Sequence, residues 1–462
     1  MKKQLLLVLG VLLLLAGWLC AFLLNSMPQN RTLYILGPTL LLGVGMGVVL
    51  KAVGGKLTAL TLALTALTAL LTFNQIYPNH GVSISAFQKR LQDSSSTGTH
   101  KKLIVRDSDR SGIFADSPLL ETFGDIDVQL FARLPGAARM LSFDQQGKLY
   151  VSIPELGAVY QLTDSNGDGF AEQQILYHVG MDRPSGLLWD GDQLYVAEPS
   201  QVLVLQDSNH DNQVDQVRTL VANLPDDGGH WTRTLAKGSD RFLYVSIGSR
   251  CNACEESNPL RATVLKVDTV SGTYEVFARG LRNSVGLAFS PDQQILWGSD
   301  NGRDMLGDEL PPDEINQIRA GGNYGWPQCY GRQTPDPQFG SKKICRETIP
   351  SQVDLPAHSA PLGIAFGDGL NAPDEYRNSL YVALHGSWNR SRPRGYKLIR
   401  IPYRDGLMAD HGKEFLRGWL ASSGQAWGRP VAPLVGPDGN LYLSDDRADA
   451  VYRIKWKGTG AD

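Results

Sequence analysis

Leu149-Tyr150-Val151-Ser152 is the first copy of a phrase that recurs along the chain and decides its fold. Each copy follows a polar turn and consists of a leucine, an aromatic residue, an apolar residue or glycine, and a small residue. The other copies are Leu194–Ala197, Leu243–Ser246, Leu296–Ser299, Leu380–Ala383 and Leu441–Ser444. Short strands that repeat every roughly 40 to 60 residues are typical of propeller blades, because each blade is one small antiparallel sheet. The six copies therefore predict an all-β fold, a six-bladed β-propeller over residues 124–457.

Two features refine this prediction. A strand around Val128–Phe131 precedes the first copy, and we expect it to pair with the last blade and close the ring without a long free edge. The spacings after Leu296 and Leu380 are long, 84 and 61 residues, which indicates insertions. Because the loops on one face of such a scaffold build its site, we expect the chemistry there.

The first 73 residues differ in composition from the rest. Apolar runs cover Gln4–Leu24, Leu33–Leu50 and Leu57–Phe73, and each is about long enough to span a ~30 Å hydrocarbon layer as a helix. A cleaved signal peptide is the alternative for the first run, but no clean small-x-small cleavage site follows it. We predict a transmembrane region of about three helices in residues 1–73, with two spans as the alternative, and a linker in residues 74–123.

The basic residues between these runs predict the orientation. Lys2 and Lys3 precede the first run, and Lys51 and Lys56 lie between the second and third, whereas only Arg31 lies between the first and second. The positive-inside rule places such lysines in the cytoplasm. With three spans the protein is predicted to be a multi-pass protein of a bacterial-type inner membrane, with the propeller on the periplasmic side. With two spans the propeller is cytoplasmic.

Charge and cysteine content narrow the class of protein. The net charge is −3 with mixed signs and no basic arm, so nothing favours a nucleic-acid partner. Cys251, Cys254, Cys329 and Cys345 form an even set that suits disulfides in an oxidising compartment. Cys251-x-x-Cys254 also matches half of a zinc motif, but no second half exists. Among three possible connectivities, we choose Cys251–Cys254 and Cys329–Cys345.

Two acidic loops have the residue spacing of calcium sites, with alternating oxygen ligands. The first loop consists of Asp164, Asn166, Asp168 and the turn residue Gly169, with Glu172 beyond; the second consists of Asp207, Asn209 and Asp211, with Asp215 beyond. The second has Asn212 where glycine is preferred, and both lack the distant glutamate of a full loop. The alternative is an ordinary Asp/Asn/Gly turn.

Several phrases, collinear over residues 125–456, resemble the glucose/sorbosone dehydrogenases that use pyrroloquinoline quinone (PQQ). They are Gly228–Leu235, Glu275–Phe289, Asp313–Ile318, Gly322–Pro327, Gly386–Arg390 and Gly428–Val431. The last two are closer to the sorbosone branch than to soluble glucose dehydrogenase. The resemblance implies a quinoprotein oxidoreductase that oxidises a sugar or related aldose, polyol or aldehyde with PQQ and calcium. A membrane quinone or a periplasmic cytochrome is the implied electron acceptor.

The resemblance also implies roles for individual residues. His230 is the general base that takes the hydroxyl proton while hydride leaves the substrate carbon for the quinone, a task that suits imidazole. Arg282 stabilises negative charge on the quinone oxygen, and Asn283 beside it contacts the cofactor. The alternatives are a surface loop histidine and a structural ion pair.

One of the two arginines that bind the cofactor in the soluble glucose enzymes is not present in this sequence. Arg429 matches a basic residue that clamps the cofactor, but the second arginine of the soluble glucose enzymes is Val431 here. This change puts the contacts to the cofactor's carboxylates in doubt. Arg390 and Arg392 are the candidate substitutes.

Calcium ligands are implied at two further places. Asn301-Gly302-Arg303 matches the stretch whose backbone carbonyls, those of Gly302 and Arg303, hold the cofactor's calcium, which acts as a Lewis acid. Asp313, Glu314 and Tyr324 match a second, structural calcium site.

Two other function classes remain open. Six-bladed propellers also include calcium-dependent lactonases and esterases, which hold calcium in the central channel with carboxylate and Asn side chains. A non-catalytic extracytoplasmic binding propeller is the third possibility, and Val431 is the kind of change that would accompany loss of catalysis.

Overall fold

The computed structural model describes residues 98–457. The predicted membrane spans and residues 74–97 of the predicted linker lie outside the described residues. Among the helices of residues 98–457, none has the length and apolar character of a membrane span. Residues 305–310 and 389–391 group apart from the rest of the described chain. All the sheets belong to the other, larger unit.

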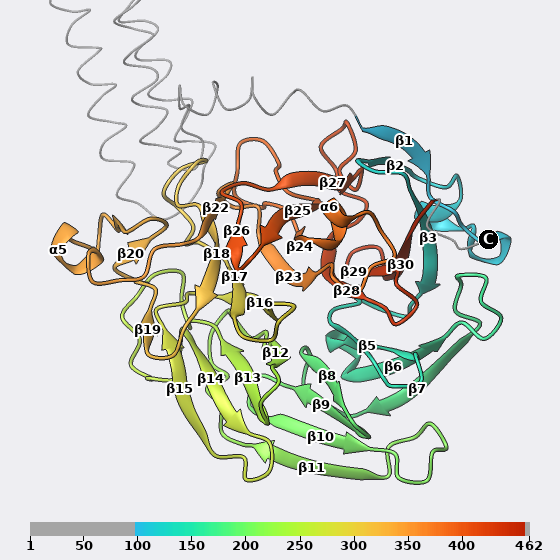
Figure 1. Cartoon of the computed structure of the whole chain (residues 1–462), viewed down its shortest axis with the longest axis horizontal. Coiled ribbons are helices and arrows are strands. Elements are labelled where there is room, and N and C mark those ends of the chain that lie inside the picture. Colours follow the sequence, from blue (N-terminus) through green and yellow to red (C-terminus); the bar gives the residue numbers. More distant parts are fainter. Residues whose placement is uncertain (1–97, 458–462) are drawn as a thin grey trace, which may run out of the picture. The chain divides into compact units, whose positions relative to one another are not determined.

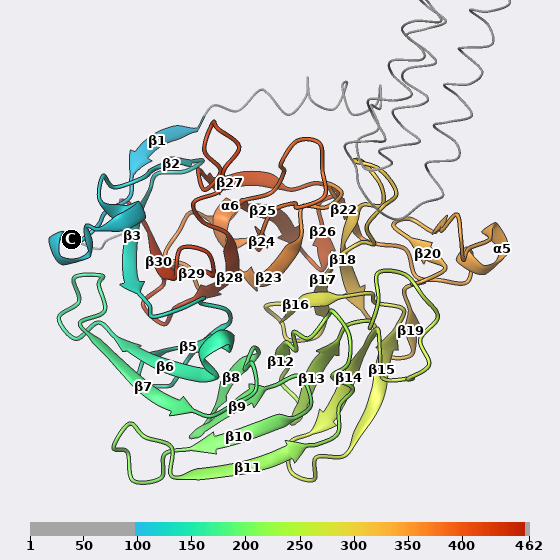
Figure 2. The ribbon, with the colours of Figure 1, turned by 180° about the vertical axis from the view of Figure 1, so that it is seen from behind.

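Seven sheets lie in the larger unit; one has two strands, and each of the other six contains one four-stranded antiparallel meander (Figures 1 and 2). From inside outward the meanders are β4 (Leu141–Phe143), β5 (Leu149–Ile153), β6 (Ala158–Thr163), β7 (Gln173–Val179); β8 (Leu187–Asp190), β9 (Gln193–Ala197), β10 (Val202–Gln206), β11 (Gln216–Val221); β12 (Leu235–Lys237), β13 (Phe242–Ile247), β14 (Thr263–Asp268), β15 (Tyr274–Arg279); β16 (Ser284–Phe289), β17 (Leu296–Asp300), β18 (Asp313–Ile318), β22 (Val353–Leu355); β23 (Pro361–Phe366), β24 (Ser379–Leu384), β25 (Lys397–Arg404), β27 (Lys413–Arg417); and β28 (Pro430–Val435), β29 (Leu441–Asp445), β30 (Ala450–Trp456), β3 (Ile126–Arg133). The innermost strands β4, β8, β12, β16, β23 and β28 contact one another in this order, and β28 returns to β4. The predicted all-β propeller is confirmed, and each phrase copy forms the second strand of one of the six sheets.

The aromatic residue of the phrase explains how neighbouring blades pack. Tyr150 of β5 lies 4.9 Å from Trp189 on the innermost strand of the next blade, and Tyr244 lies 5.2 Å from Phe289 in the same relation, measured between ring centroids. Every residue of β5 is buried. A strand that is covered on both faces needs a continuous apolar run, which is what the phrase supplies. Tilted and edge-to-face ring contacts add to the area that each blade buries.

The ring closes as predicted. Strand β3 pairs antiparallel with β30, so the last blade takes its outermost strand from the beginning of the fold. In Figure 1 the blue strand β3 lies beside the red strand β30. Tyr442 of β29 packs 5.0 Å from Phe143 of β4, again between centroids, and joins the last blade to the first. Closure leaves no unpaired edge between the two ends of the ring.

The predicted linker is wrong for its described part, residues 98–123. These residues form β1 (Thr99–Lys102), the 3₁₀ turns η2 (Asp107–Asp109) and η3 (Gly112–Phe114), and β2 (Leu119–Thr122). Strands β1 and β2 pair, and β2 pairs with β27, which extends the fifth blade outward. The physical reason is burial of apolar side chains that have no regular spacing in the sequence: Leu103, Val105, Phe114 and Leu120 are all buried.

The remaining elements are short. They are η4 (Pro154–Leu156), β19 (Gly322–Asn323), β20 (Cys329–Tyr330), β21 (Thr334–Pro335), α5 (Lys342–Cys345), α6 (Asp374–Arg377) and β26 (Leu407–Met408). The predicted disulfides Cys251–Cys254 and Cys329–Cys345 are confirmed. The second one closes the insertion that separates β18 from β22.

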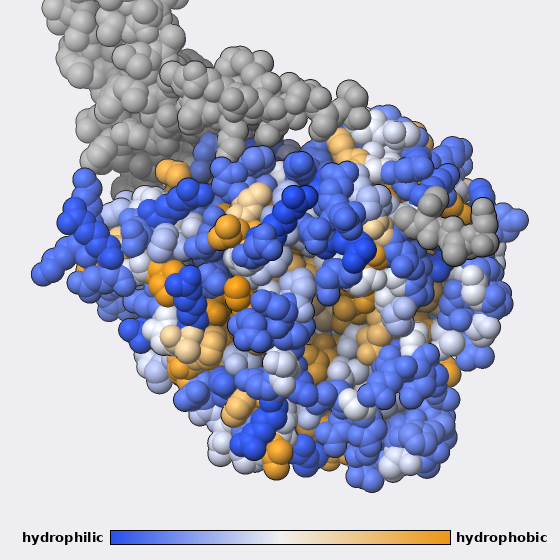
Figure 3. Space-filling view, viewed as in Figure 1, coloured by the Kyte–Doolittle hydropathy of each residue, from blue (hydrophilic) through white to orange (hydrophobic). Residues whose placement is uncertain are grey.

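An apolar cluster lies among the innermost strands. It consists of Met140, Val285, Leu362, Val431 and Ala432, all buried. Beyond it, a channel is lined by residues of all six innermost strands. Figure 3 shows apolar atoms in a hollow near the middle of one face, with polar side chains around them.

Closure of the ring predicts a stability effect at β3. Leu130 is fully buried, so Leu130→Ala removes packing between the first and last strands and should lower the free energy of unfolding by about 2–5 kcal/mol. Leu407→Ala is the matched control, because Leu407 is 74% exposed. Denaturant unfolding followed by circular dichroism measures both. Equal stability of the two variants would show that the ring does not depend on this strand.

Candidate functional site

Strand direction brings the predicted catalytic residues to one end of the propeller. In every antiparallel blade the beginning of the innermost strand and the end of the second strand lie at the same end. His230 precedes β12, Arg282 and Asn283 precede β16, Asn301 follows β17, and Arg429 precedes β28. We call this end the site face.

His230 is held in one tautomer by its neighbour Ser249. The imidazole Nδ1 lies 2.8 Å from the Ser249 carbonyl oxygen and 2.8 Å from Ser249 Oγ. The hydroxyl of Ser249 donates to the Cys251 carbonyl at 2.8 Å, so both oxygens accept from Nδ1. A proton on Nδ1 leaves the lone pair of Nε2 available as a base.

The environment of His230 also keeps it uncharged. Burial lowers the pKa of His230 to about 3, and the positive charge of Arg282 acts in the same direction. The hydrogen bond to Ser249 opposes this shift, whereas Arg261 and Arg233 add to it. The imidazole is therefore neutral at physiological pH, which is the protonation state from which a general base acts.

Two buried arginines fix the loop that carries His230, and sequence reasoning missed both. Arg233 donates to the carbonyl of His230 at 3.0 Å and to that of Pro225 at 2.6 Å. Arg261 donates to the carbonyl of Gly248 at 3.2 Å. Gly248 must be glycine, because a Cβ there would lie 2.6 Å from His230 Cβ. Arg233 lies within a phrase that the resemblance already included, so its position in that phrase was a usable signal.

Arg282 is buried and directed by three hydrogen bonds. Its Nε donates to the Asn252 carbonyl at 2.9 Å, Nη2 donates to Asn252 Oδ1 at 3.0 Å, and Nη1 donates to the Asn301 carbonyl at 3.0 Å. Asp304 Oδ2 lies 3.7 Å from Nη2. Burial lowers the pKa of Arg282, and the carboxylates of Asp304 and Asp300 oppose the shift. The guanidinium is therefore a fixed charge beside the imidazole of His230.

Asp300 organises the backbone beneath these groups. Its two oxygens accept from the backbone N–H of Arg282 at 3.0 Å and of Asn283 at 2.8 Å. Burial raises the pKa of Asp300 to about 6, against these hydrogen bonds and that of Ser284. Asn301 Nδ2 donates to the Asn283 carbonyl at 3.2 Å. The predicted cofactor residues Asn283 and Asn301 are thus neighbours on the site face.

Arg429 lies at the site face with its cation not matched by a carboxylate. It donates to the carbonyls of His385, at 3.1 Å, and Gly386, and its Cζ lies 5.5 Å from the ring centroid of Tyr396. Within residues 98–457 no carboxylate lies at ion-pair distance from Arg429. Val431 is fully buried in the apolar cluster among the innermost strands. Its side chain therefore belongs to the core and is not exposed on the site face.

The structure argues against Arg390 as a cofactor contact. Its side chain is 2% exposed and forms an ion pair with Glu309 at 2.6 Å, and it also donates to the Asp308 carbonyl. Breaking a buried pair would leave an uncompensated charge, which is costly. Arg392, the other candidate, is exposed.

A second polar network lies on the site face, and the sequence did not reveal it. Asp446 accepts from Arg139 at 2.7 Å and pairs with His385 Nε2 at 2.7 Å. Burial acts to raise the pKa of Asp446, but these two partners hold it well below its usual range. Arg139 Cζ also lies 5.7 Å from the ring centroid of Trp231, and Arg183 Cζ lies 5.8 Å from it. The residues come from different blades, so no local pattern marks them.

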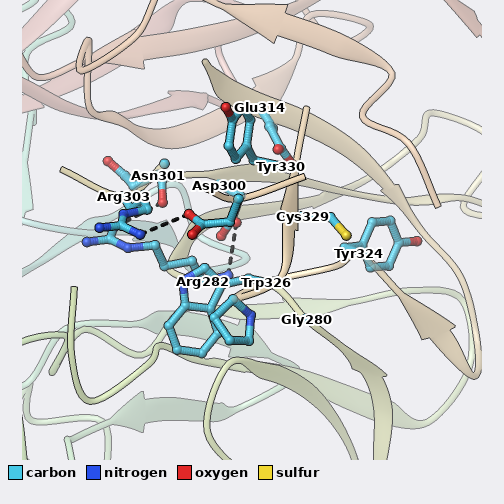
Figure 4. Close-up of a pocket in the computed structure, with 13 residues that line it drawn as sticks. Gly280, Arg282, Asp300, Asn301, Arg303, Glu314, Tyr324, Trp326, Cys329 and Tyr330 are labelled. Atoms are coloured by element: carbon cyan, nitrogen blue, oxygen red, sulfur yellow. Dashed lines mark hydrogen bonds and ion pairs between the residues drawn. The ribbon is translucent and has the colours of Figure 1, made fainter. Parts of the chain in front are cut away.

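A pocket beside Arg282 contains the residues predicted to hold the cofactor's calcium (Figure 4). Gly302 and Arg303 line it together with Asp300, Glu314 and Trp326. Within the described chain, no N–H or O–H group donates to the carbonyl oxygens of Gly302 or Arg303. Oxygens of this kind are available as ligands for a hard cation.

The predicted structural calcium ligands are only partly brought together. Glu314 and Tyr324 line the pocket in Figure 4, but Asp313 does not, because adjacent residues of a strand point to opposite faces. Asp313 accepts from Gly302 N at 2.9 Å and Ala360 N at 3.0 Å. Burial raises the pKa of Asp313 to about 7 and, with the Asp300 carboxylate, that of Glu314 to about 8. This set stays a prediction.

The two acidic loops lie at the end of the propeller opposite the site face, because each connects the third and fourth strands of its blade. Carboxylate oxygens of Asp164, Asp168 and Glu172 lie within 4.8 Å of one another. In the second loop, Asp207 accepts from the backbone N–H groups of Asp211 and Asn212. The carboxylates of this loop do not form a cluster of three oxygens as close together as those of the first loop. Only the first loop gathers its predicted ligands, and both calcium assignments stay predictions.

The chain is similar in sequence to a known protein family and to several proteins. The family model described as TrAA12-like matches residues 124–457. A pyrroloquinoline quinone-dependent pyranose dehydrogenase of Coprinopsis cinerea is 37% identical over 307 residues, which cover 52% of this chain and 41% of that protein. An uncharacterized protein of Borreliella burgdorferi is 30% identical over 338 residues, covering 69% of this chain and 86% of its own length. The chain therefore spans less than half of the Coprinopsis relative.

A solved structure has the same fold. The Trichoderma reesei protein of carbohydrate-active enzyme family AA12 superposes with a TM-score of 0.65 and 22% identity, covering 74% of this chain and 98% of that one. At this identity the similarity concerns the fold alone.

The surroundings of His230 predict its titration. Because burial and Arg282 lower its pKa to about 3, the imidazole should remain neutral from pH 8 down to pH 5. The ring chemical shifts of the apoprotein, labelled at histidine, measure this by NMR, and the His230 signal is the one lost in His230→Gln. A titration midpoint near 6.5, the ordinary value, would contradict the buried arrangement.

Proposed function

The chain belongs to the TrAA12-like family, and from this premise we propose that it is a membrane-anchored quinoprotein that oxidises a sugar with PQQ and calcium. The membership confirms the family resemblance that the sequence indicated. The substrate class includes aldoses and related polyols or aldehydes.

One observation carries the proposal: a neutral histidine with a free Nε2 lies beside a fixed, buried guanidinium. His230 Nε2 takes the proton of the substrate hydroxyl. Nδ1 cannot do so, because it carries a proton that it donates to the oxygens of Ser249 in hydrogen bonds. Arg282 would stabilise the negative charge that develops on the oxygen of a bound quinone. It needs no reorganisation to do so, since Asn252 and Asn301 already direct it.

The residues of the site face fit PQQ, a flat molecule with three carboxylates. Arg429 offers a guanidinium that no carboxylate of the described chain neutralises, and such a fork suits carboxylate recognition. The carboxamide of Asn283 lies near His230, on the other side of Gly248. When bound, the quinone supplies an acceptor for two electrons. Arg429 and Asn283 hold it, and His230 handles the proton.

Calcium fits the same pocket. Gly302 and Arg303 line it, and no group among residues 98–457 donates a hydrogen bond to their carbonyl oxygens. These are oxygen ligands of the type that calcium prefers, and the ion would act there as a Lewis acid.

The axial cluster disfavours a lactonase. A catalytic calcium in the central channel needs carboxylate and amide oxygens on the axis. The innermost strands instead bring Met140, Val285, Leu362, Val431 and Ala432 together there. Apolar side chains offer no ligand, so the redox function is the better supported one.

The proposal extends to location and electron acceptor. Three apolar runs in residues 1–73 anchor the chain in a bacterial-type inner membrane, and the propeller is periplasmic. Two disulfides support an oxidising compartment. A membrane quinone or a periplasmic cytochrome takes the electrons.

Reconstitution tests the activity. The apoprotein is titrated with PQQ and calcium, then supplied with aldoses and a dye acceptor. We expect dye reduction that requires both PQQ and calcium, and a loss of turnover of about 10²- to 10⁴-fold in His230→Ala, because the base is removed. His411→Ala is the control, since that side chain is 75% exposed.

Three results would contradict the proposed function or the role of His230. A wild-type protein that neither binds PQQ nor reduces dye is not a dehydrogenase. Hydrolysis of lactones by the same preparation would establish the rival activity. Full turnover in His230→Ala would remove the role assigned to this residue.

Fractionation tests the location. An alkaline wash should leave the chain in the membrane fraction, because the apolar runs span the bilayer. Protease added to intact spheroplasts should remove a C-terminal epitope tag. Release by the wash would disprove the anchor, and a tag cleaved only after lysis would place the propeller in the cytoplasm.

A further inference from the structure

The loop between β13 and β14 contacts both proposed catalytic residues. We propose that Asn252, in the segment 249–256 closed by the Cys251–Cys254 disulfide, is a positioning residue that holds Arg282, while Ser249 of the same segment holds His230. We call this segment the clamp loop. The inference rests on the proposed function and adds to it the residues that set the catalytic geometry.

Asn252 meets Arg282 with two oxygens. Its carbonyl accepts from Nε at 2.9 Å and its Oδ1 accepts from Nη2 at 3.0 Å, so one residue binds two nitrogens of the guanidinium. Oδ1 also accepts from the backbone N–H of Asp304 at 2.7 Å, and Nδ2 donates to the Asp304 carbonyl at 3.2 Å. The carboxamide is therefore held from both sides, and its orientation is set before any ligand binds.

Ser249 joins the two catalytic residues within one backbone unit. Its N–H donates to the Arg282 carbonyl at 2.7 Å, while its carbonyl and hydroxyl both accept from His230. The hydroxyl is directed in turn by the Cys251 carbonyl. A shift of the clamp loop thus moves the guanidinium and the imidazole together.

The loop is closed by three contacts. The disulfide joins Cys251 to Cys254 on either side of Asn252. Glu256 Oε1 accepts from the backbone N–H of Arg250 at 2.5 Å. The Arg250 carbonyl accepts from Gly229 N at 3.1 Å, which ties the loop to the segment that carries His230. A short covalent ring around Asn252 lowers the conformational freedom of the residue that directs Arg282.

Positioning of this kind matters because the benefit of a preorganised charge depends on its exact placement. Two of the three hydrogen bonds of the Arg282 side chain require that Asn252 presents both oxygens. A truncated side chain at 252 leaves a buried N–H group of Arg282 without its acceptor, which is costly for a charged donor.

A double-mutant cycle on the whole 462-residue chain tests the inference. The variants are Asn252→Ala, Arg282→Lys, which keeps the charge without the forked geometry, and both together. In the apoprotein, the two changes should affect the free energy of unfolding non-additively, because they remove the same contact. Asn258→Ala is the matched control: the Asn258 side chain accepts from Leu260 N in the same region, so its effect should add to that of Arg282→Lys.

Measurements of turnover provide a second test of the role of Asn252. With PQQ, calcium and dye, Asn252→Ala should lower kcat about ten- to a hundredfold with little change in KM, as expected when a charge acting in the transition state is misplaced. Asn252→Asp keeps the Oδ1 acceptor but loses the Nδ2 donor to Asp304 and adds a negative charge beside Arg282, so it should recover only part of the loss. Asn258→Ala should leave kcat unchanged.

The disulfide has its own test. Joint replacement of Cys251 and Cys254 by serine should lower kcat as Asn252→Ala does, and the combined variant should be no worse than either. Mass spectrometry after alkylation of the unfolded protein verifies that Cys329–Cys345 remains oxidised. Unchanged kcat in the serine variant would remove the disulfide from the clamp.

The outcomes separate the inference from the proposed function. Additive unfolding effects of Asn252→Ala and Arg282→Lys would overturn the inference whether or not the protein is active. Coupled unfolding effects without any PQQ-dependent turnover would leave the contact established and the dehydrogenase disproved. Coupled effects with unchanged kcat in Asn252→Ala would show that Asn252 does not position Arg282 for catalysis.

Discussion

The packing of each blade against the next is the constraint on which the rest of the structure depends. The aromatic side chain of a second strand meets the innermost strand of the following blade, as Tyr150 meets Trp189 and Tyr442 meets Phe143 across the closing point. Because the contact repeats around the ring, the ends of the innermost strands converge on one axis. Loops that are distant in sequence then lie within hydrogen-bonding distance, and a site can form at all.

The site face is built largely from arginines that donate to backbone carbonyls. Arg233 and Arg282 meet carbonyl oxygens in this way, and Arg429 does so at His385 and Gly386. A carbonyl directs a guanidinium without neutralising it, whereas a carboxylate partner would do both. The arrangement keeps the positive charge available for a ligand while burial keeps each side chain in place. An anionic quinone is the kind of molecule that such a face suits.

The same charges keep the proposed base, His230, uncharged. A cationic environment disfavours imidazolium, so His230 stays neutral, and the carbonyl of Ser249 decides which nitrogen is free. The clamp loop connects the imidazole of His230 to the guanidinium of Arg282. Its disulfide belongs with an oxidising compartment, where such a covalent ring persists.

The sequence by itself determined the repeat, the closing strand and the residues that carry the family phrases, because each depends on local patterning or on motifs that stay contiguous. His230, Arg282 and Arg429 lie within such phrases. Of the three possible pairings of the four cysteines, the structure has Cys251–Cys254 and Cys329–Cys345. Tertiary structure alone decided the rest. Arg139 and Asp446 are 307 residues apart and meet only when the ring closes, and Val431 faces the core rather than the ligand because of its place on β28. Side-chain partners across blades depend on closure of the whole ring, and no local pattern contains that information.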